Sequence, residues 1–395
     1  MPAHNGVPPA AANPSTGSSA PAAGKSRNRI LELDGLRAFA VLSVVIYHIG
    51  IYSGGVPKPP PFVASILECI GLQGVFTFFI ISGFIITRLL IREKTAQGRV
   101  SLGNFYIRRF FRIIPPFAAY LLVLLVLRTF GLVTVSNRNF FISAIFLGDT
   151  TLFGPDPWLV GHTWSLSVEE QFYLIFPPLL CYVFGFRTRA TLILLGLFYA
   201  VCVLALRLAI VSSAHFGSAW TSLWYLYYFR YIICGMVIAI YEPWVLRWVA
   251  HPSRFVPLAL ALAIFGLFML DGPFRPSSAA IRAAVSATAP CISGLFVMWF
   301  VQNPSQCRFL CWPLIQWLGA CSYSIYLWQQ LFTAPPAYYH GWNWSTPLLA
   351  CTATLVCAAA SRYLVETPCI ALGHRICKRR ILLKSAPHAN LPEPI

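Results

Sequence analysis

The chain of 395 residues alternates long apolar runs with short polar ones. A helix needs roughly 20 mostly apolar residues to cross the hydrocarbon core of a bilayer. Ten runs approach that length and predict ten membrane-spanning helices, centred on residues 32–51, 70–91, 113–132, 163–185, 191–211, 221–241, 255–271, 284–301, 314–334 and 346–366. One further run, residues 139–147, is too short to cross and is expected to be interfacial or re-entrant. The pattern predicts an all-α, polytopic integral membrane protein.

The composition supports this class. Hydrophobic residues make up 57% of the chain and charged residues 10%, whereas soluble domains have roughly 45–50% and about 25%. The mean hydropathy is +0.68. A formal net charge of +17 would suggest nucleic acid in a soluble chain, but here Lys and Arg lie in short loops between apolar runs. The positive-inside rule explains them, and we expect no nucleic-acid partner.

The distribution of basic residues predicts the orientation. With the N-terminus in the cytoplasm, twenty Lys and Arg residues fall on the inner side, five in outer loops and four within spans. Counting residues 139–147 as an eleventh crossing would put later basic loops on the wrong side. We therefore expect about ten helices, with both termini cytoplasmic.

Three segments follow from composition. Residues 1–29 are rich in Pro, Ala, Ser and Gly and are expected to be a disordered cytoplasmic tail. Residues 30–370 are the expected membrane domain, and residues 371–395 a basic cytoplasmic C-terminal tail. The twelve cysteines are scattered without metal-ligand spacing, so no metal site is expected.

The first apolar run, "LDGLRAFAVLSVVIYH", contains Asp34, Arg37 and His48. Eleven residues rotate a helix by about 1100°, close to three turns, so Arg37 and His48 share one face roughly 16 Å apart. Asp34 can pair with Arg37. A histidine inside a membrane is suited to proton transfer near neutral pH. The alternative is a structural ion pair and a hydrogen-bonded core histidine.

A second cluster is "FYIRRFFRIIPPF", on the cytoplasmic side just before a span. Arg109 and Arg112 are three residues apart and share a helix face. Arginine forks suit phosphates and other anions. Contact with lipid head groups is the simpler interpretation.

Polar residues also lie deep in two later spans. Glu169 and Glu170, in "GHTWSLSVEEQFYLIFP", follow His162 by about two turns, where carboxylates are costly. Gln329, in "GACSYSIYLWQQ", is level with His48 under the predicted topology. We therefore expect His48, Glu169, Glu170 and Gln329 to converge in the outer third of the membrane.

These motifs resemble the acyltransferase type 3 family over nearly the whole chain after the tail. The resemblance rests on "LDGLR" with R-x10-H, "FFIISGFIIT", "RRFFRIIP", "WSLSVEEQFYLIFP", "SYSIYLW" and "YLVETP". It implies transfer of an acyl group, often acetyl, from cytoplasmic acyl-CoA to a hydroxyl. The implied acceptors are surface polysaccharides, other carbohydrates or lipid-linked molecules. We expect a multi-pass protein of the cell membrane, the bacterial inner membrane, in contact with its lipids and with no permanently bound cofactor.

The resemblance also implies roles for single residues. His48 would be the catalytic residue, and Arg109 and Arg112 would hold the CoA phosphates. Arg37 would line the cofactor channel or simply pair with Asp34. The remaining expected site residues are Glu169 and Glu170, which would stabilise the imidazolium or bind the acceptor, and Gln329, Tyr326 and His162, which would contact the acceptor. Arg230 loosely resembles an arginine that the family places before a glycine.

One position departs from the family pattern. Many members have Y-L-W-H where this chain has Gln329, and glutamine forms hydrogen bonds but does not titrate. We expect the change to affect which acceptor is used. Since the chain ends soon after its last expected span, we expect the transferase core alone.

Two other classes fit the hydropathy. A transporter or flippase would more often show an internal repeat, and none is evident. A non-catalytic scaffold would not need a histidine and paired carboxylates at one depth.

Overall fold

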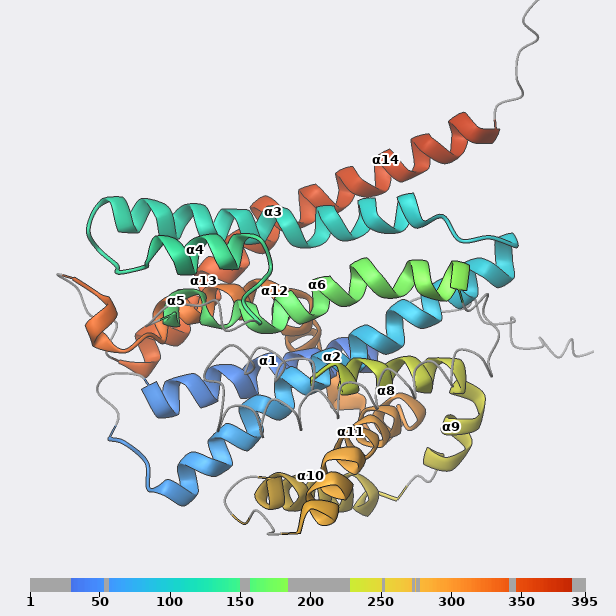
Figure 1. Ribbon diagram of the computed structural model, residues 1–395, viewed down its shortest axis with the longest axis horizontal. Helices are drawn as coiled ribbons and strands as arrows, with labels where there is room; N and C mark the ends of the chain where they lie inside the picture. The colour runs from blue at the N-terminus through green and yellow to red at the C-terminus, as the bar shows by residue number, and fades with distance from the viewer. Residues whose placement is uncertain are drawn as a thin grey trace, which may run out of the picture. The chain divides into compact units, whose positions relative to one another are not determined.

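The structure is a computed structural model that describes residues 30–52, 57–149, 157–183, 228–250, 253–271, 274, 278–340 and 346–385. These residues form helices and loops, with one isolated β-bridge between Val133 and Tyr339 (Figure 1). The first half contains α1 (Leu31–Tyr52), α2 (Pro61–Gln97), α3 (Leu102–Thr129), α4 (Asn137–Ala144), α5 (Trp158–Gly161), α6 (Thr163–Pro178) and the π-helical turn η1 (Leu179–Val183).

The second half contains α8 (Phe229–Ile240), α9 (Glu242–Val249), α10 (Phe255–Asp271), α11 (Ala279–Gln302), η3 (Arg308–Cys311), α12 (Pro313–Phe332), η4 (Pro336–Tyr338), α13 (Pro347–Ser361), the π-helical η5 (Arg362–Glu366) and α14 (Thr367–Ser385). The predicted all-α class is confirmed for the described residues.

Several helices could cross a bilayer. Five described segments are long and apolar enough: α1, α2, α3, residues 284–302 of α11, and the run Pro347–Leu382. A sixth arises if α8 and α9, which meet at a bend of 96°, form one span. The protein is therefore a polytopic membrane protein, as predicted. The expected span 191–211 and residues 221–227 of the next one lie outside the described residues.

The predicted span 314–334 forms α12, but this helix is not among the segments apolar enough to cross alone. From Leu318 to Phe332 its side chains are almost all buried, including the polar Ser322, Gln329 and Gln330. Polar residues at membrane depth are tolerated inside a bundle, where other helices shield them from lipid. α12 is therefore an internal helix, and it packs between α1 and α13.

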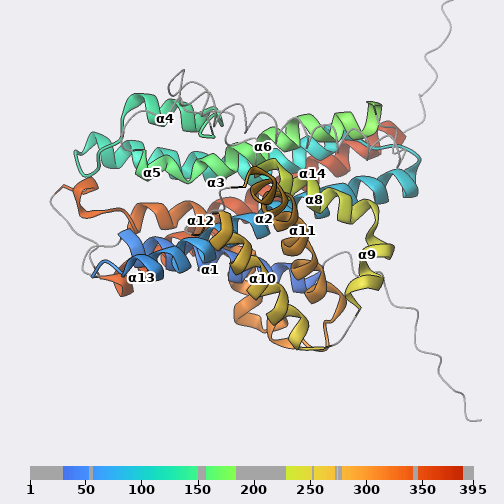
Figure 2. The same cartoon turned by 60° about the horizontal axis from the view of Figure 1, so that its bottom comes forward.

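Two predicted boundaries shift. The run expected at 163–185 begins as α6 and becomes a π-helical turn after Pro177 and Pro178, whose missing N–H groups interrupt the α-helical ladder. The run expected at 346–366 continues without a break in helix through α14 to Ser385. α14 lies beside α3 in both views (Figure 2).

Backbone contact brings the site helices together. A Cβ atom on Gly319 of α12 would collide with the carbonyl oxygen of Asp34 on α1. Small residues allow such close approach between membrane helices. Further along both helices His48 contacts Gln329, so α1 and α12 run in the same direction. This register holds the candidate site residues of the two helices opposite one another.

Candidate active site

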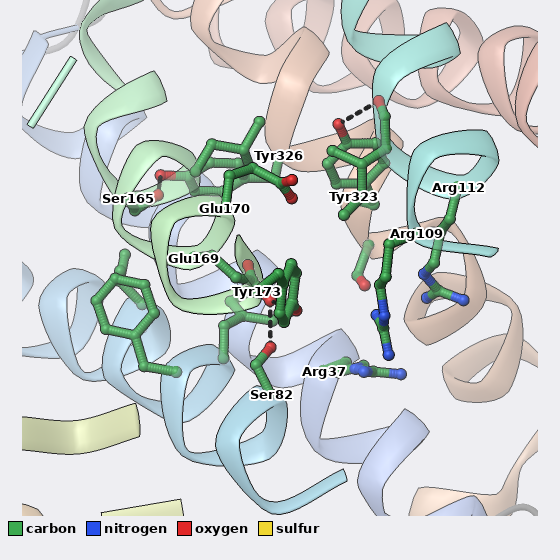
Figure 3. A pocket seen from close by; sticks show the side chains of 16 residues that line it. Arg37, Ser82, Arg109, Arg112, Ser165, Glu169, Glu170, Tyr173, Tyr323 and Tyr326 are labelled. Carbon is green, nitrogen blue, oxygen red and sulfur yellow. Dashed lines mark hydrogen bonds between the residues drawn. The ribbon is translucent and has the colours of Figure 1, made fainter. Parts of the chain in front are cut away.

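A cavity of about 80 Å³ lies among α1, α2, α3, α6 and α12 (Figure 3). That volume has room for a few water molecules or one small polar group. Its polar lining consists of Arg37, Ser82, Arg109, Arg112, Ser165, Glu169, Glu170, Tyr173, Ser322, Tyr323 and Tyr326. We call it the arginine cavity, because three guanidinium groups from two helices gather along one side of it.

Arg109 and Arg112 project from α3 into the bundle, one helical turn apart. The guanidinium carbon of Arg109 lies 4.9 Å from the ring centroid of Tyr173, a cation–π contact that orients the side chain. Among the described residues no carboxylate lies within 4.0 Å of either guanidinium. Both cations therefore face the cavity without a close counter-ion.

Arg37 enters the same cavity from α1. Its Nη1 lies 3.2 Å from Oδ1 of Asp34, so the ion pair predicted from the i, i+3 spacing is present. Arg37 also lines the cavity, so one side chain both pairs with Asp34 and forms part of the cavity wall. The two predicted roles of Arg37 are thus geometrically compatible.

The two glutamates lie on α6 and face the arginine cavity. Glu169 accepts hydrogen bonds from the hydroxyls of Ser82 and Tyr173, whereas the Glu170 carboxylate points towards the Tyr323 side of the cavity (Figure 3). Glu169 is thereby held between Ser82 of α2 and Tyr173, whose ring contacts the guanidinium of Arg109.

The expected convergence of four polar residues is correct for one pair only. Nδ1 of His48 lies 2.7 Å from Oε1 of Gln329, as the predicted depth of both residues requires. The glutamates, in contrast, line the arginine cavity, whose described lining does not include His48 or Gln329. The reason is helical rise: seven or eight residues after His162 place Glu169 and Glu170 about 11 Å further along α6.

A chain of amide groups determines the orientation of His48. The Nε2 group of Gln330 donates to the carbonyl oxygen of Trp158 at 2.9 Å, and Gln330 Oε1 accepts from Nε2 of Gln329 at 2.9 Å. A backbone carbonyl can only accept, so each amide in the chain has one possible orientation. Gln329 therefore presents Oε1 to His48, which must carry its proton on Nδ1. Nε2 of His48 keeps the lone pair of a base.

Aromatic rings surround His48 on its other sides. Its ring centroid lies 5.4 Å from that of Trp158 and 5.1 Å from that of Tyr47. The His48 side chain is only half-buried, so a reactant could approach it. The geometry is that of an oriented, accessible imidazole.

Tyr326 lines the arginine cavity, and its ring centroid lies 5.5 Å from that of His162. The Tyr326 hydroxyl donates to the carbonyl oxygen of His162 at 3.0 Å and lies 2.6 Å from Oγ of Ser165. The His162 side chain is 4% exposed, and neither of its ring nitrogens has a hydrogen-bond partner within the described part of the chain. A buried imidazole without partners is uncommon and identifies a position where a ligand or water can bind.

Arg230 lies elsewhere. On α8, its Nη1 donates to the carbonyl oxygen of Ser286 at 2.6 Å and to the hydroxyl of the same residue, which ties α8 to α11. It does not line the arginine cavity as described. Its loose resemblance to a family arginine therefore does not bring it into this cavity.

Sequence reasoning missed four contributors to these contacts: Ser82, Tyr173, Gln330 and the Trp158 carbonyl. Ser82 lies in the quoted "FFIISGFIIT", and Tyr173 follows Glu169 by four residues, so both carried a usable signal. Gln330 directly follows Gln329. The Trp158 carbonyl is a backbone group, so the identity of the residue at this position does not indicate the contact.

Comparison with known proteins agrees with the resemblance. Residues 30–363 match the model of the type 3 acyltransferase domain, and the chain belongs to this family. O-acetyltransferase OatA of Staphylococcus aureus strain NCTC 8325 is 31% identical over 328 residues, which cover 75% of this chain and 49% of the relative. A candidate O-acetyltransferase of S. aureus strain COL is 27% identical over 351 residues, covering 77% and 50%. The chain thus spans about half the length of the curated relatives it matches. No solved structure matches it.

Proposed function

We propose that this protein is a membrane O-acetyltransferase that moves an acyl group, acetyl in the first instance, from cytoplasmic acyl-CoA to a hydroxyl of a carbohydrate or lipid-linked acceptor. The observation that carries the proposal is the pairing of two features on one helix. Arg37 faces a cavity rich in guanidinium groups. His48, about 16 Å further along α1, is an oriented imidazole whose Nε2 has no hydrogen-bond partner among the described residues.

The arginine cavity supplies the donor end. Within the described part of the chain, Arg109 and Arg112 have no carboxylate within 4.0 Å, and they suit a phosphate next to the pantetheine arm of acyl-CoA. Arg37 extends the positive wall towards His48. The cavity is narrow, which fits an unbranched arm that passes inward and brings its thioester towards the imidazole.

His48 supplies the chemistry. Its Nε2 takes the proton of the acceptor hydroxyl as the hydroxyl oxygen attacks the thioester carbonyl, and the C–S bond then breaks. The proton passes from Nε2 to the leaving thiolate, so His48 returns neutral. Gln329 keeps Nδ1 protonated throughout. A two-step route through an acyl-histidine would use the same lone pair, and trapping acylated His48 by mass spectrometry would distinguish the two routes.

The remaining site residues act around this step. Glu169 and Glu170 line the arginine cavity, apart from His48, so of their two expected roles acceptor binding is the one retained. Tyr326, which lines the arginine cavity, and the ring of His162, which has no partner among the described residues, are proposed to bind the acceptor with Gln329. Buried polar groups that gain partners only from a ligand favour that ligand over an analogue lacking its hydroxyl.

We also propose ten spans with both termini cytoplasmic, in a bacterial inner membrane, with the turn between α2 and α3 on the cytoplasmic side. Lys58 and Arg99 are both exposed and lie at opposite ends of α2. A cysteine in place of Lys58 should react with an impermeant thiol reagent added to intact cells, and a cysteine in place of Arg99 should react only after lysis. The unmodified protein gives the background from its own cysteines. The opposite pattern would contradict a site that spans the membrane.

The amide chain predicts how substitutions at Gln329 behave. Gln329→Leu should slow transfer roughly 10–100-fold, since a buried donor left without its acceptor costs about 1–3 kcal/mol. Gln329→His should retain most activity, because one imidazole nitrogen can accept from His48 while the other donates to Gln330. Nitrogen chemical shifts of labelled histidine should show His48 protonated on Nδ1 in the wild type and as mixed tautomers in Gln329→Leu. Equal tautomer ratios in both proteins would contradict the proposed chain.

The function itself is tested with purified protein in lipid nanodiscs. Acetyl-CoA should release free CoA thiol, with acetyl recovered on an added oligosaccharide or as acetate. A transporter, flippase or binding scaffold would leave the thioester intact. Absence of any thiol release by folded protein that binds acetyl-CoA would reject the proposal.

A further inference from the structure

A second cavity, which we call the basic basin, lies where the end of α2, the turn to α3 and the end of α14 meet. Its volume is about 690 Å³. Its charged side chains are Arg92, Glu93, Arg99, Arg108 and Arg380. None of its residues takes part in the proposed reaction.

The basin is a built feature rather than a random group of surface arginines. α2 ends at Gln97, and the next residue, Gly98, has a left-handed φ of 69° that turns the chain sharply. Glu93 then holds the turn: its Oε1 accepts from the backbone N–H of Ser101 at 2.8 Å, and its Oε2 lies 3.6 Å from Arg108. One carboxylate thus fixes the backbone and one wall of the basin.

The charge of the basin is unbalanced. Four arginines and one glutamate line it, which leaves three positive charges uncompensated. Like charges gathered in one concave site repel each other and attract anions. The arginines come from α2, the turn, α3 and α14, so their guanidinium groups converge from several directions on any anion inside. Such a site suits a ligand with several phosphates.

Size distinguishes the basin from the arginine cavity. Ligand pockets for molecules with ring systems usually measure about 300–1,000 Å³. The basin falls in that range at about 690 Å³, whereas the arginine cavity has about 80 Å³. The two sites are neighbours on α3, because Arg108 lines the basin and the next residue, Arg109, lines the arginine cavity.

We propose that the basic basin binds the phosphorylated adenine nucleotide end of acyl-CoA, while Arg109 and Arg112 receive the phosphate nearer the pantetheine arm. The proposal rests on the proposed function, which supplies a donor of this chemistry on this face. It divides the donor between two sites: a wide, open one for the nucleotide and a narrow one for the arm. Binding should weaken as salt is raised, since the arginines are largely exposed.

The test is a calorimetric titration of full-length protein with adenosine 3′,5′-bisphosphate, in nanodiscs of the neutral lipid phosphatidylcholine. The double variant Arg99→Ala, Arg380→Ala should weaken binding roughly tenfold or more, because two charged contacts are lost. The double variant Arg375→Ala, Arg379→Ala is the matched control: it removes the same two charges from exposed positions of α14 that do not line the basin, and it should bind as the wild type does. Arg99→Lys, Arg380→Lys should recover part of the affinity and guards against a folding defect.

A lipid phosphate offers the same chemistry, so a second arm uses the anionic lipid phosphatidylglycerol. If the basin is a head-group site, the double variant should lose co-purifying phosphatidylglycerol while its nucleotide affinity in neutral nanodiscs stays unchanged. That result would overturn the proposal. The titration needs no turnover, so a protein that binds the nucleotide in the basin yet transfers no acetyl would support the basin and contradict the proposed function.

Discussion

The His48→Gln protein should bind acetyl-CoA with unchanged affinity and lose acetyl transfer by roughly 10²–10⁴-fold, the contribution of one positioned general base. Glutamine can retain a hydrogen bond to Gln329, so packing between α1 and α12 should survive. It has no lone pair of comparable basicity where Nε2 lies. The measurement is single-turnover transfer alongside donor binding by calorimetry.

The matched control is His340→Gln. His340 bonds to Thr134 at an exposed position near the β-bridge, outside the candidate site, and the same chemical change there should leave transfer as in the wild type. A His48→Gln protein that acylates at nearly the wild-type rate would make the histidine a packing residue. The chemistry would then have to be sought at His162 or the two glutamates.

Removing the two cavity arginines is expected to have the second largest effect. The double variant Arg109→Ala, Arg112→Ala should weaken acetyl-CoA binding by more than tenfold, because each lost contact to a charged group is worth about 1.5–3 kcal/mol. Lysine at both positions should recover only part of the affinity, since an ammonium lacks the planar fork. Direct titration with acetyl-CoA measures both.

Arg128→Ala is the control for this pair. Arg128 lies in the last turn of the same helix, away from the cavity lining, so its loss should not change donor affinity. An unchanged affinity in the double alanine protein would mean that Arg109 and Arg112 contact lipid head groups rather than the donor. The thermal stability of both proteins shows whether the bundle tolerates the substitutions.

Much of this arrangement could be predicted because helices convert spacing into geometry. The i, i+3 spacing of Asp34 and Arg37 predicted their ion pair, and the depth of His48 and Gln329 in their spans predicted their contact. Each expected span within the described region corresponds to a helix, but α9 and α14 lie outside the expected spans. α12 was predicted as a span, yet its polar residues are accommodated because neighbouring helices bury it.

The parts that could not be predicted depend on contacts between helices. The membrane depth of Glu169 and Glu170 depended on where α6 begins, which the sequence does not define. The prediction therefore placed them beside His48, whereas they lie among the arginines. The hydrogen bond from Ser82 to Glu169 depends on how α2 is rotated about its axis relative to α6, which the sequence does not specify. The basic basin forms because the helix expected at residues 346–366 continues through α14, which brings Arg380 to the turn after α2.

The central claim is that the acetyl donor and the acetylated product lie on opposite sides of the membrane, with His48 between them. The most direct measurement uses sealed proteoliposomes whose protein is oriented with the basic basin outward. Radiolabelled acetyl-CoA is added outside, and an N-acetylglucosamine oligomer is enclosed in the lumen. The account predicts labelled acetyl ester or acetate in the lumen and free CoA outside. Recovery of label and CoA together on the outer side, with none in the lumen, would contradict it.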